Sequence, residues 1–61
     1  MNGERLKALL DEKGIQQAEL AENVGVSQAF ISYLIKGLKQ PSLVLLKRIA
    51  DYLHVPIDEL V

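Results

Sequence analysis

The stretch QAELAENVGVSQAFISYLIK, residues 17–36, decides the fold of this chain. Its apolar side chains recur at helical spacing, at Leu20, Val24, Val26, Ile31 and Leu34. Small residues stand at Ala21 and Gly25, where two steeply crossing helices have no room for bulk and the chain needs a left-handed turn. The pattern therefore predicts two short helices, at residues 17–24 and 28–36, joined by a tight turn.

Helical periodicity covers the rest of the chain as well, and no segment shows the period of two that a half-buried strand requires. We predict a first helix at residues 3–13, capped by Asn2, and two later helices at residues 43–53 and 57–60. The apolar face of the fourth helix is expected to comprise Leu43, Leu46, Ile49, Ala50 and Leu53. The predicted fold is all-α, with five helices in a single domain spanning residues 1–61.

Composition excludes several classes of function. The chain has no Cys and a single His, so we expect no disulfide, thiolate metal site or catalytic nucleophile. No apolar run is long enough to span a membrane and no signal peptide is visible, so the expected compartment is the cytoplasm. The spacing of the acidic residues fits neither a metal site nor a catalytic pair. We therefore expect no enzymatic activity, no cofactor and no metal.

Charge is distributed unevenly along the chain. Seven Lys and Arg residues stand against eight Asp and Glu residues, and a net charge of −1 speaks against nucleic acid, since most small DNA-binding domains are basic. The segment 25–50 nevertheless contains no acid, and its cations are Lys36, Lys39, Lys47 and Arg48. Such a segment can steer a polyanion even when the total charge is near zero. Chance is the alternative explanation of this asymmetry.

The third predicted helix has two unlike faces. At 3.6 residues per turn, Ile31, Leu34 and Ile35 lie on one side and should be buried. The other side carries groups that suit base edges in a DNA groove, because Gln pairs with adenine and Ala can touch a thymine methyl. Base contacts are expected from Gln28, Ala29, Ser32 and Tyr33. Phosphate contacts are expected from flanking groups, namely Gln17, Lys36, Lys39 and Gln40. Plain solvent exposure is the alternative interpretation of each polar side chain.

Two segments together resemble the phage-repressor-like, Cro-type helix-turn-helix family, often called XRE. RLKALLDEKGIQQAELAENVGVSQAFISYLIKG, residues 5–37, is similar to the family's first three helices, and QPSLVLLKRIADYLHVPIDEL, residues 40–60, to its last two. The resemblance implies a five-helix, lambda-repressor-like domain with the helix-turn-helix in helices two and three. It further implies a transcription regulator, most often a repressor, that binds double-stranded DNA as a homodimer on a two-fold operator.

Two departures from the family pattern carry structural expectations. Where members often hold Arg and Glu in a buried ion pair, this chain has Leu10 and Ile35, which we expect to touch each other. Leu10→Arg alone should then cost about 3–5 kcal/mol, as an unpaired buried charge does. His54 replaces the usual Gly after helix four, where a side chain would strain a left-handed backbone.

Apolar residues also occupy positions where the family is usually polar. A contiguous apolar surface is better explained by a partner than by chance, so a homodimer interface is expected at Val44, Val55 and Pro56. The alternative function is a protein-interaction module or antitoxin-type regulator on the same scaffold. The mild acidity of the chain, Leu38, Ile35 and the surface at Val44 and Leu45 would suit that alternative.

Overall fold

Four α-helices and one 3-10 turn make up the fold. The computed structural model describes all 61 residues. The elements follow in the order α1 (Gly3–Lys13), α2 (Gln17–Val24), α3 (Gln28–Lys36), α4 (Leu43–Leu53) and η1 (Ile57–Glu59), with no strand. The bounds of the four α-helices agree with those predicted from the sequence, because each helix carries its own start and stop signals.

Local capping explains where the helices begin and end. Asn2, Ser27 and Ser42 each accept a hydrogen bond from the backbone N–H three residues further on, at 3.0–3.1 Å, and so begin α1, α3 and α4. Gln16 makes no such bond, so α2 begins without a side-chain cap. Gly25 ends α2 in the left-handed conformation, at φ 81°, and this turn redirects the chain into α3.

The predicted fifth α-helix at residues 57–60 is wrong. The segment is a single 3-10 turn, Ile57–Glu59, in which the N–H of Leu60 donates to the carbonyl of Ile57 at 2.8 Å. Runs this short favour the tighter i→i+3 bond. The carbonyl of Leu60 in turn accepts from the N–H of Asn2 at 2.7 Å, so the backbone is tied to the start of α1 rather than continuing a helical ladder.

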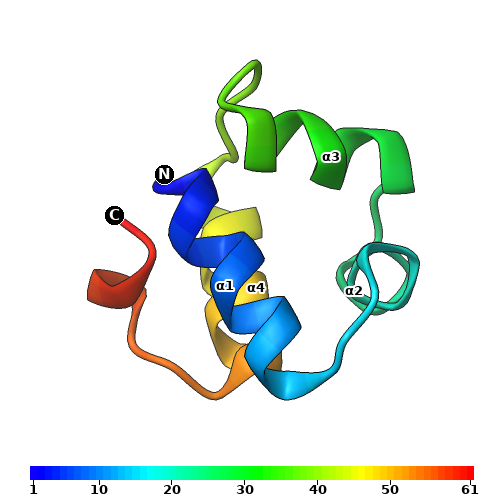
Figure 1. The fold of residues 1–61 in the computed structure, drawn as a ribbon. Helices are drawn as coiled ribbons and strands as arrows, with labels where there is room; N and C mark the ends of the chain where they lie inside the picture. The colour runs from blue at the N-terminus through cyan, green and yellow to red at the C-terminus, as the bar shows by residue number, and fades with distance from the viewer.

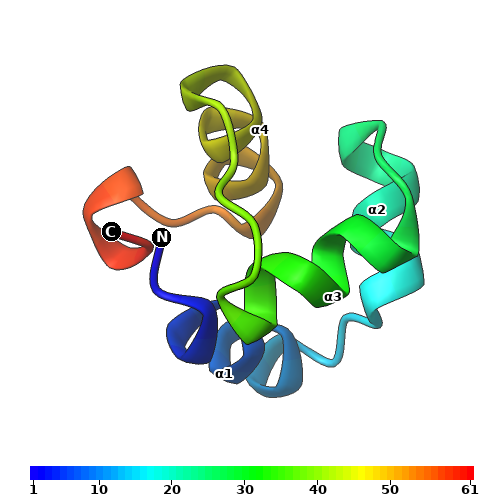
Figure 2. The same ribbon diagram turned by 90° about the horizontal axis from the view of Figure 1, so that it is seen from above.

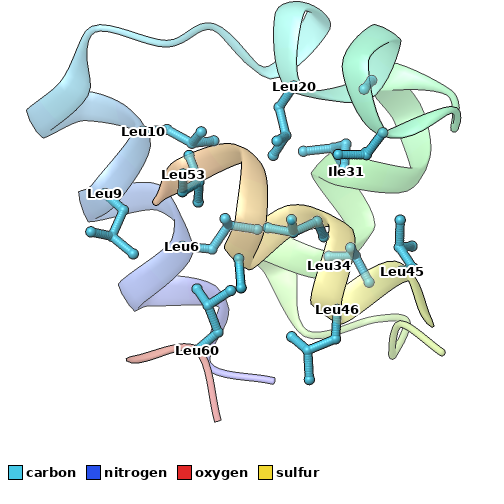
Figure 3. Packing of buried hydrophobic residues seen from close by; sticks show 14 residues of the cluster. Leu6, Leu9, Leu10, Leu20, Ile31, Leu34, Leu45, Leu46, Leu53 and Leu60 are labelled. Carbon is cyan, nitrogen blue, oxygen red and sulfur yellow. The ribbon is translucent and has the colours of Figure 1, made fainter. Parts of the chain in front are cut away.

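One apolar core lies between the helices, and no polar side chain is buried in it (Figure 3). Its largest fully buried side chains are Leu6, Leu20, Ile31, Leu34, Ile49, Leu53 and Leu60. Each burial of this kind stabilises the fold by roughly 1.5–3 kcal/mol. Each of the four α-helices contributes at least one of these side chains, and Leu60 follows η1, so the packing fixes all the helices relative to one another.

The predicted core face of α4 is wrong at its first residue. Leu43 is 68% exposed, whereas Leu45, which is not among the residues expected on the apolar face, is 8% exposed. Helical side chains lean toward the N-terminus of their helix. The side chain of Leu43, in the first position of α4, therefore extends past the end of the core, and Leu45 fills the space nearer the bundle.

Contacts between distant segments close the bundle. The two chain ends lie together, and the C-terminal end of α3 meets the start of α1 (Figures 1 and 2). The guanidinium of Arg5 pairs with the carboxylate of Glu59 at 2.6 Å, which joins α1 to η1. The hydroxyl of Tyr52 donates to the carboxylate of Glu19 at 2.7 Å, which joins α4 to α2. The longest helices have 11 residues, and none has the length and apolar character needed to cross a membrane.

Candidate nucleic-acid interface

The third helix separates its buried residues from its exposed ones as the sequence predicts. Ile31 and Leu34 are fully buried, while Gln28, Ala29 and Tyr33 are exposed, Tyr33 by 42%. The cap of Ser27 and the left-handed Gly37 limit α3 to nine residues, or about two and a half turns. A helix of this length therefore offers only a few outward positions. The exposed ones are Gln28, Ala29 and Tyr33, predicted to contact bases, and Lys36, predicted to contact phosphate.

Ser32 differs from the other three predicted base contacts because it is only partly buried rather than freely exposed. It lies about 100° around the helix from Ile31, so it stands at the margin of the buried stripe. Its side chain is also too short to extend beyond its neighbours. Ser32 is thus placed to touch only an atom that approaches α3 closely, whereas Gln28 and Tyr33 have longer reach.

An open hollow of about 530 Å³ brings a predicted base contact and a predicted phosphate contact together. Gln17, in the first turn of α2, and Gln28, in the first turn of α3, both line it. Because Gln16 does not cap α2, the first N–H groups of that helix have no side-chain partner. Free N–H groups and the positive end of the helix dipole suit an anion such as a phosphate.

The remaining predicted phosphate contacts lie at the other end of α3. Lys36 is in its last turn, and Lys39 and Gln40 follow in the loop to α4; all three are exposed. The side-chain oxygen of Gln40 accepts a hydrogen bond from the amino group of Met1 at 2.8 Å. Gln40 is therefore partly engaged within the protein, and the two lysines are the freer groups at this end.

The cations of the segment 25–50 form no ion pairs within the protein. Arg5 and Lys7 in α1 are each paired with a carboxylate, whereas Lys36, Lys39, Lys47 and Arg48 form no ion pair. The acids Asp11, Glu12, Glu19 and Glu22 are all exposed on α1 and α2, and no three metal-ligating side chains cluster anywhere. A chain with a slight negative charge thus keeps unpaired positive charge in the segment that contains α3.

The hydrogen bond between Tyr52 and Glu19 is a structural contact that the sequence does not reveal, because 33 residues separate its partners. The bond to the Glu19 carboxylate, with smaller effects of desolvation and of the negative charge, raises the pKa of the Tyr52 hydroxyl above its usual value of 10.0. Glu19 lies in the first turn of α2, next to Gln17 and the uncapped N–H groups. The bond therefore holds one acid near the candidate phosphate site in a fixed position.

The three residues predicted for a dimer interface lie at the two ends of α4. Val44, 61% exposed, is in the first turn of α4, whereas Val55 and Pro56 follow its last residue. The nine residue steps of helical rise from Val44 to the last residue of α4, Leu53, separate the two places by about 13 Å. Val44 instead lines a hollow together with Phe30 of α3 and residues of the α2–α3 turn. Only Val55, which is partly buried, and the exposed Pro56 remain neighbours at the corner between α4 and η1.

Comparison with known proteins covers nearly the whole chain. The sequence model of the helix-turn-helix family matches residues 6–60. The HTH-type transcriptional regulator SinR of Bacillus subtilis (strain 168) is 34% identical over 61 residues, which make up 98% of this chain and 55% of SinR. SinR of Bacillus licheniformis matches to the same extent. The chain spans about half the length of these curated relatives.

Solved structures show the same arrangement of helices. The restriction-modification controller protein C.AhdI from Aeromonas hydrophila superposes with a TM-score of 0.90 at 30% identity, over 97% of this chain and 89% of that protein. The master regulator for biofilm formation SinR, in complex with DNA, superposes with a TM-score of 0.87 at 33% identity, over 97% of this chain and 98% of the other. The likeness therefore extends through all the elements from α1 to α4.

Proposed function

This chain belongs to the helix-turn-helix family, and from that premise we propose that it is a sequence-specific regulator of transcription that places α3 in the major groove of double-stranded DNA. The observation that carries the proposal is the division of α3 into a buried stripe, Ile31 and Leu34, and an exposed face of polar and small side chains. A relative with the same fold has been solved in complex with DNA.

Each exposed residue of α3 suits a particular contact. Gln28, in the first turn, has an amide that can pair with the two groups that adenine presents in the major groove. Ala29 can lie against a thymine methyl group, and Tyr33 can donate its hydroxyl proton to a base edge or a phosphate. Ser32 would contribute only where the DNA approaches α3 closely, because it is partly buried.

The phosphates would be held on both sides of α3. On one side, Gln17 and the uncapped N–H groups at the start of α2 lie next to Gln28. On the other side, Lys36 and Lys39 extend from the end of α3 and the following loop, while Gln40 contributes less because it holds the chain terminus. Contacts on both flanks fix the register of the helix, and the base contacts then select the sequence.

We propose further that the protein acts as a repressor and as a homodimer on a two-fold operator, with half-sites about 34 Å apart. The small number of cations supports the dimer, because one copy would release few counterions and bind weakly at physiological salt. We assign the dimer interface to the corner between α4 and η1, at Val55 and Pro56. Val44 is not assigned to it, because it lies at the opposite end of α4.

Selection of bound sequences from a random pool of double-stranded DNA tests the proposal. We expect one enriched motif, and on that motif Gln28→Ala should lose roughly 1–3 kcal/mol of binding free energy and its preference at one base pair. Glu12→Ala, an exposed substitution on α1, serves as the control and should leave both unchanged. Unchanged preference in Gln28→Ala would refute the base assignment, and a pool without enrichment would refute the function.

A protein-interaction module or antitoxin-type regulator is the second candidate. Three large apolar side chains near the junction of α3 and α4, Leu38, Leu43 and Val44, are each more than 60% exposed. Exposed apolar residues that gather in one region are typical of partner binding. Electrophoretic mobility of random-sequence DNA at low salt distinguishes the two candidate functions. A DNA-binding protein binds such DNA non-specifically and retards it, whereas a pure protein-binding module does not.

A further inference from the structure

Gly3, the first residue of α1, is a glycine for reasons of space rather than of backbone conformation. Its φ is not positive, so any residue could adopt its backbone, and alanine would ordinarily favour a helix more. A Cβ atom at Gly3, however, would overlap the carbonyl oxygen of Ile35 and lie 2.6 Å from that of Leu34, where ordinary contacts are 3.4–4 Å. The backbone of α1 thus rests directly against the last turn of α3.

We propose that Gly3 is a positioning residue for DNA recognition, which sets the pose of α3 without touching DNA. The inference rests on the proposed function, because it concerns the helix that would enter the groove. The atoms in the way are backbone carbonyls rather than the end of a flexible side chain. A larger residue must therefore displace one of the two helices.

The start of α1 is held from several directions and has little freedom to move away. The N–H of Asn2 donates to the carbonyl of Leu60 at 2.7 Å, and the amino group of Met1 donates to Gln40 at 2.8 Å. One turn further on, Leu6 is fully buried between the helices (Figure 3). These contacts tie residues 1–6 to the C-terminal turn, the α3–α4 loop and the core.

The displacement would therefore fall on the C-terminal half of α3. Restoring an ordinary contact at the oxygen of Leu34 requires a shift from 2.6 to 3.4 Å, or 0.8 Å. The other end of α3 is anchored by the short turn from α2 and by Ile31, which is fully buried in the core. A tilt about that anchor moves Tyr33 and Lys36 more than Gln28, so a single methyl group would weaken one end of the DNA contact selectively.

Double-mutant cycles on the selected operator test this selectivity. Gly3→Ala should raise the Kd roughly tenfold, about the loss of one contact. The penalties of Tyr33→Ala and Lys36→Ala should shrink in the Gly3→Ala background, because those contacts are already impaired, while the penalty of Gln28→Ala should persist. Equal penalties in both backgrounds, or an unchanged Kd, would overturn the inference.

Two controls separate positioning from general loss of stability. Glu4→Ala adds the same residue type at the next, exposed position and should leave the Kd unchanged. Leu9→Ala destabilises α1 on a side that points away from α3 (Figure 3). The Kd values of both variants are measured under conditions in which both are folded. If the Kd of Gly3→Ala is no higher than that of Leu9→Ala, the inference is also overturned. If Gly3→Ala does not fold alone, the cycles are run in a His54→Gly background, which removes the left-handed non-glycine residue.

The contact itself can be tested without DNA, which distinguishes its failure from that of the proposed function. In the free protein, Gly3→Ala should shift the amide NMR resonances of residues 33–37 well beyond the changes caused by Glu4→Ala. Unshifted resonances would overturn the positioning role even if the protein binds DNA. Shifted resonances in a protein that selects no DNA sequence would support the contact and refute the function.

Discussion

Replacing Leu10 by Arg and Ile35 by Glu, singly and together, tests whether an apolar contact between α1 and α3 occupies the place of a buried ion pair. Leu10 is buried, and Ile35 is partly buried and packs against the same core. That these two side chains touch each other stays a prediction. The double substitution introduces the two charges that the resemblance to the phage-repressor-like family implies at these positions, so it asks whether the scaffold accommodates them.

The structure narrows the loss of stability that we expect for Leu10→Arg. An unpaired buried charge costs about 3–5 kcal/mol. Leu10 also lines the open hollow beside Gln17 and Gln28, through which an Arg head could reach water, so we expect Leu10→Arg to cost about 3 kcal/mol. A chain of this length has a stability of roughly 3–9 kcal/mol, so the variant should be near its unfolding threshold, with a Tm lower by about 12–24 °C. Ile35→Glu, which is less buried, should cost roughly 1–2 kcal/mol.

Urea unfolding followed by far-UV circular dichroism measures these free energies of unfolding. If the two side chains are neighbours, the loss of stability in the double variant should be about 1–3 kcal/mol smaller than the sum of the two single losses. Leu10→Met is the volume-conserving control and should lose less than about 1.5 kcal/mol. A loss below about 1 kcal/mol in Leu10→Arg would show that the site is not a buried one. A coupling energy below about 0.5 kcal/mol would show that the residues do not touch.

Three further changes probe the backbone, the DNA contact and the α2–α4 tie. His54→Gly should raise the free energy of unfolding by about 0.5–1 kcal/mol in urea titrations, because His54 has φ 57°; no gain would mean that its backbone is unstrained. Lys39→Ala should weaken binding to all DNA sequences alike and lower the slope of log K against log salt by about 1, whereas Lys13→Ala should not; a change of base preference would contradict a phosphate role. The raised pKa of Tyr52 gives stability that is fully present below pH 10.0 and is lost as pH rises through the folded-state pKa. When the free energy of unfolding is measured at rising alkaline pH, Tyr52→Phe should lack that part of the decline. Curves identical to those of the unsubstituted protein would contradict the linkage to Glu19.

Helix positions could be predicted from the sequence because their signals are local. Asn2, Ser27 and Ser42 bond to groups three residues away, and Gly25 and Gly37 stop their helices by their own backbone conformation. The buried stripe of α3 is equally local, since the 3.6-residue period decides which side chains share a face. Such features need no knowledge of where the other helices lie.

Features that depend on distant segments could not be predicted in the same way. Nothing near Gly3 in the sequence indicates that the carbonyls of α3 lie against it, and Arg5 finds Glu59 from 54 residues away. The exposure of Leu43 follows from where the core ends, which periodicity cannot give. Tertiary geometry decided each of these outcomes.

The pose of α3 is a property of the whole bundle rather than of α3 itself. A nine-residue helix is marginal on its own in water, so its place depends on the short turn from α2 at one end, on Ile31 and Leu34 in the middle and on the backbone of Gly3 at the other end. None of these groups is among the residues assigned to base contacts. On the proposed function, selectivity for a DNA sequence would depend on two separate sets of residues, one that meets the bases and one that decides where the first set stands. Because the sets do not overlap, we expect that the outward residues can change and alter the preferred sequence without unfolding the protein, whereas a change at Gly3 would alter recognition while every outward residue stays the same.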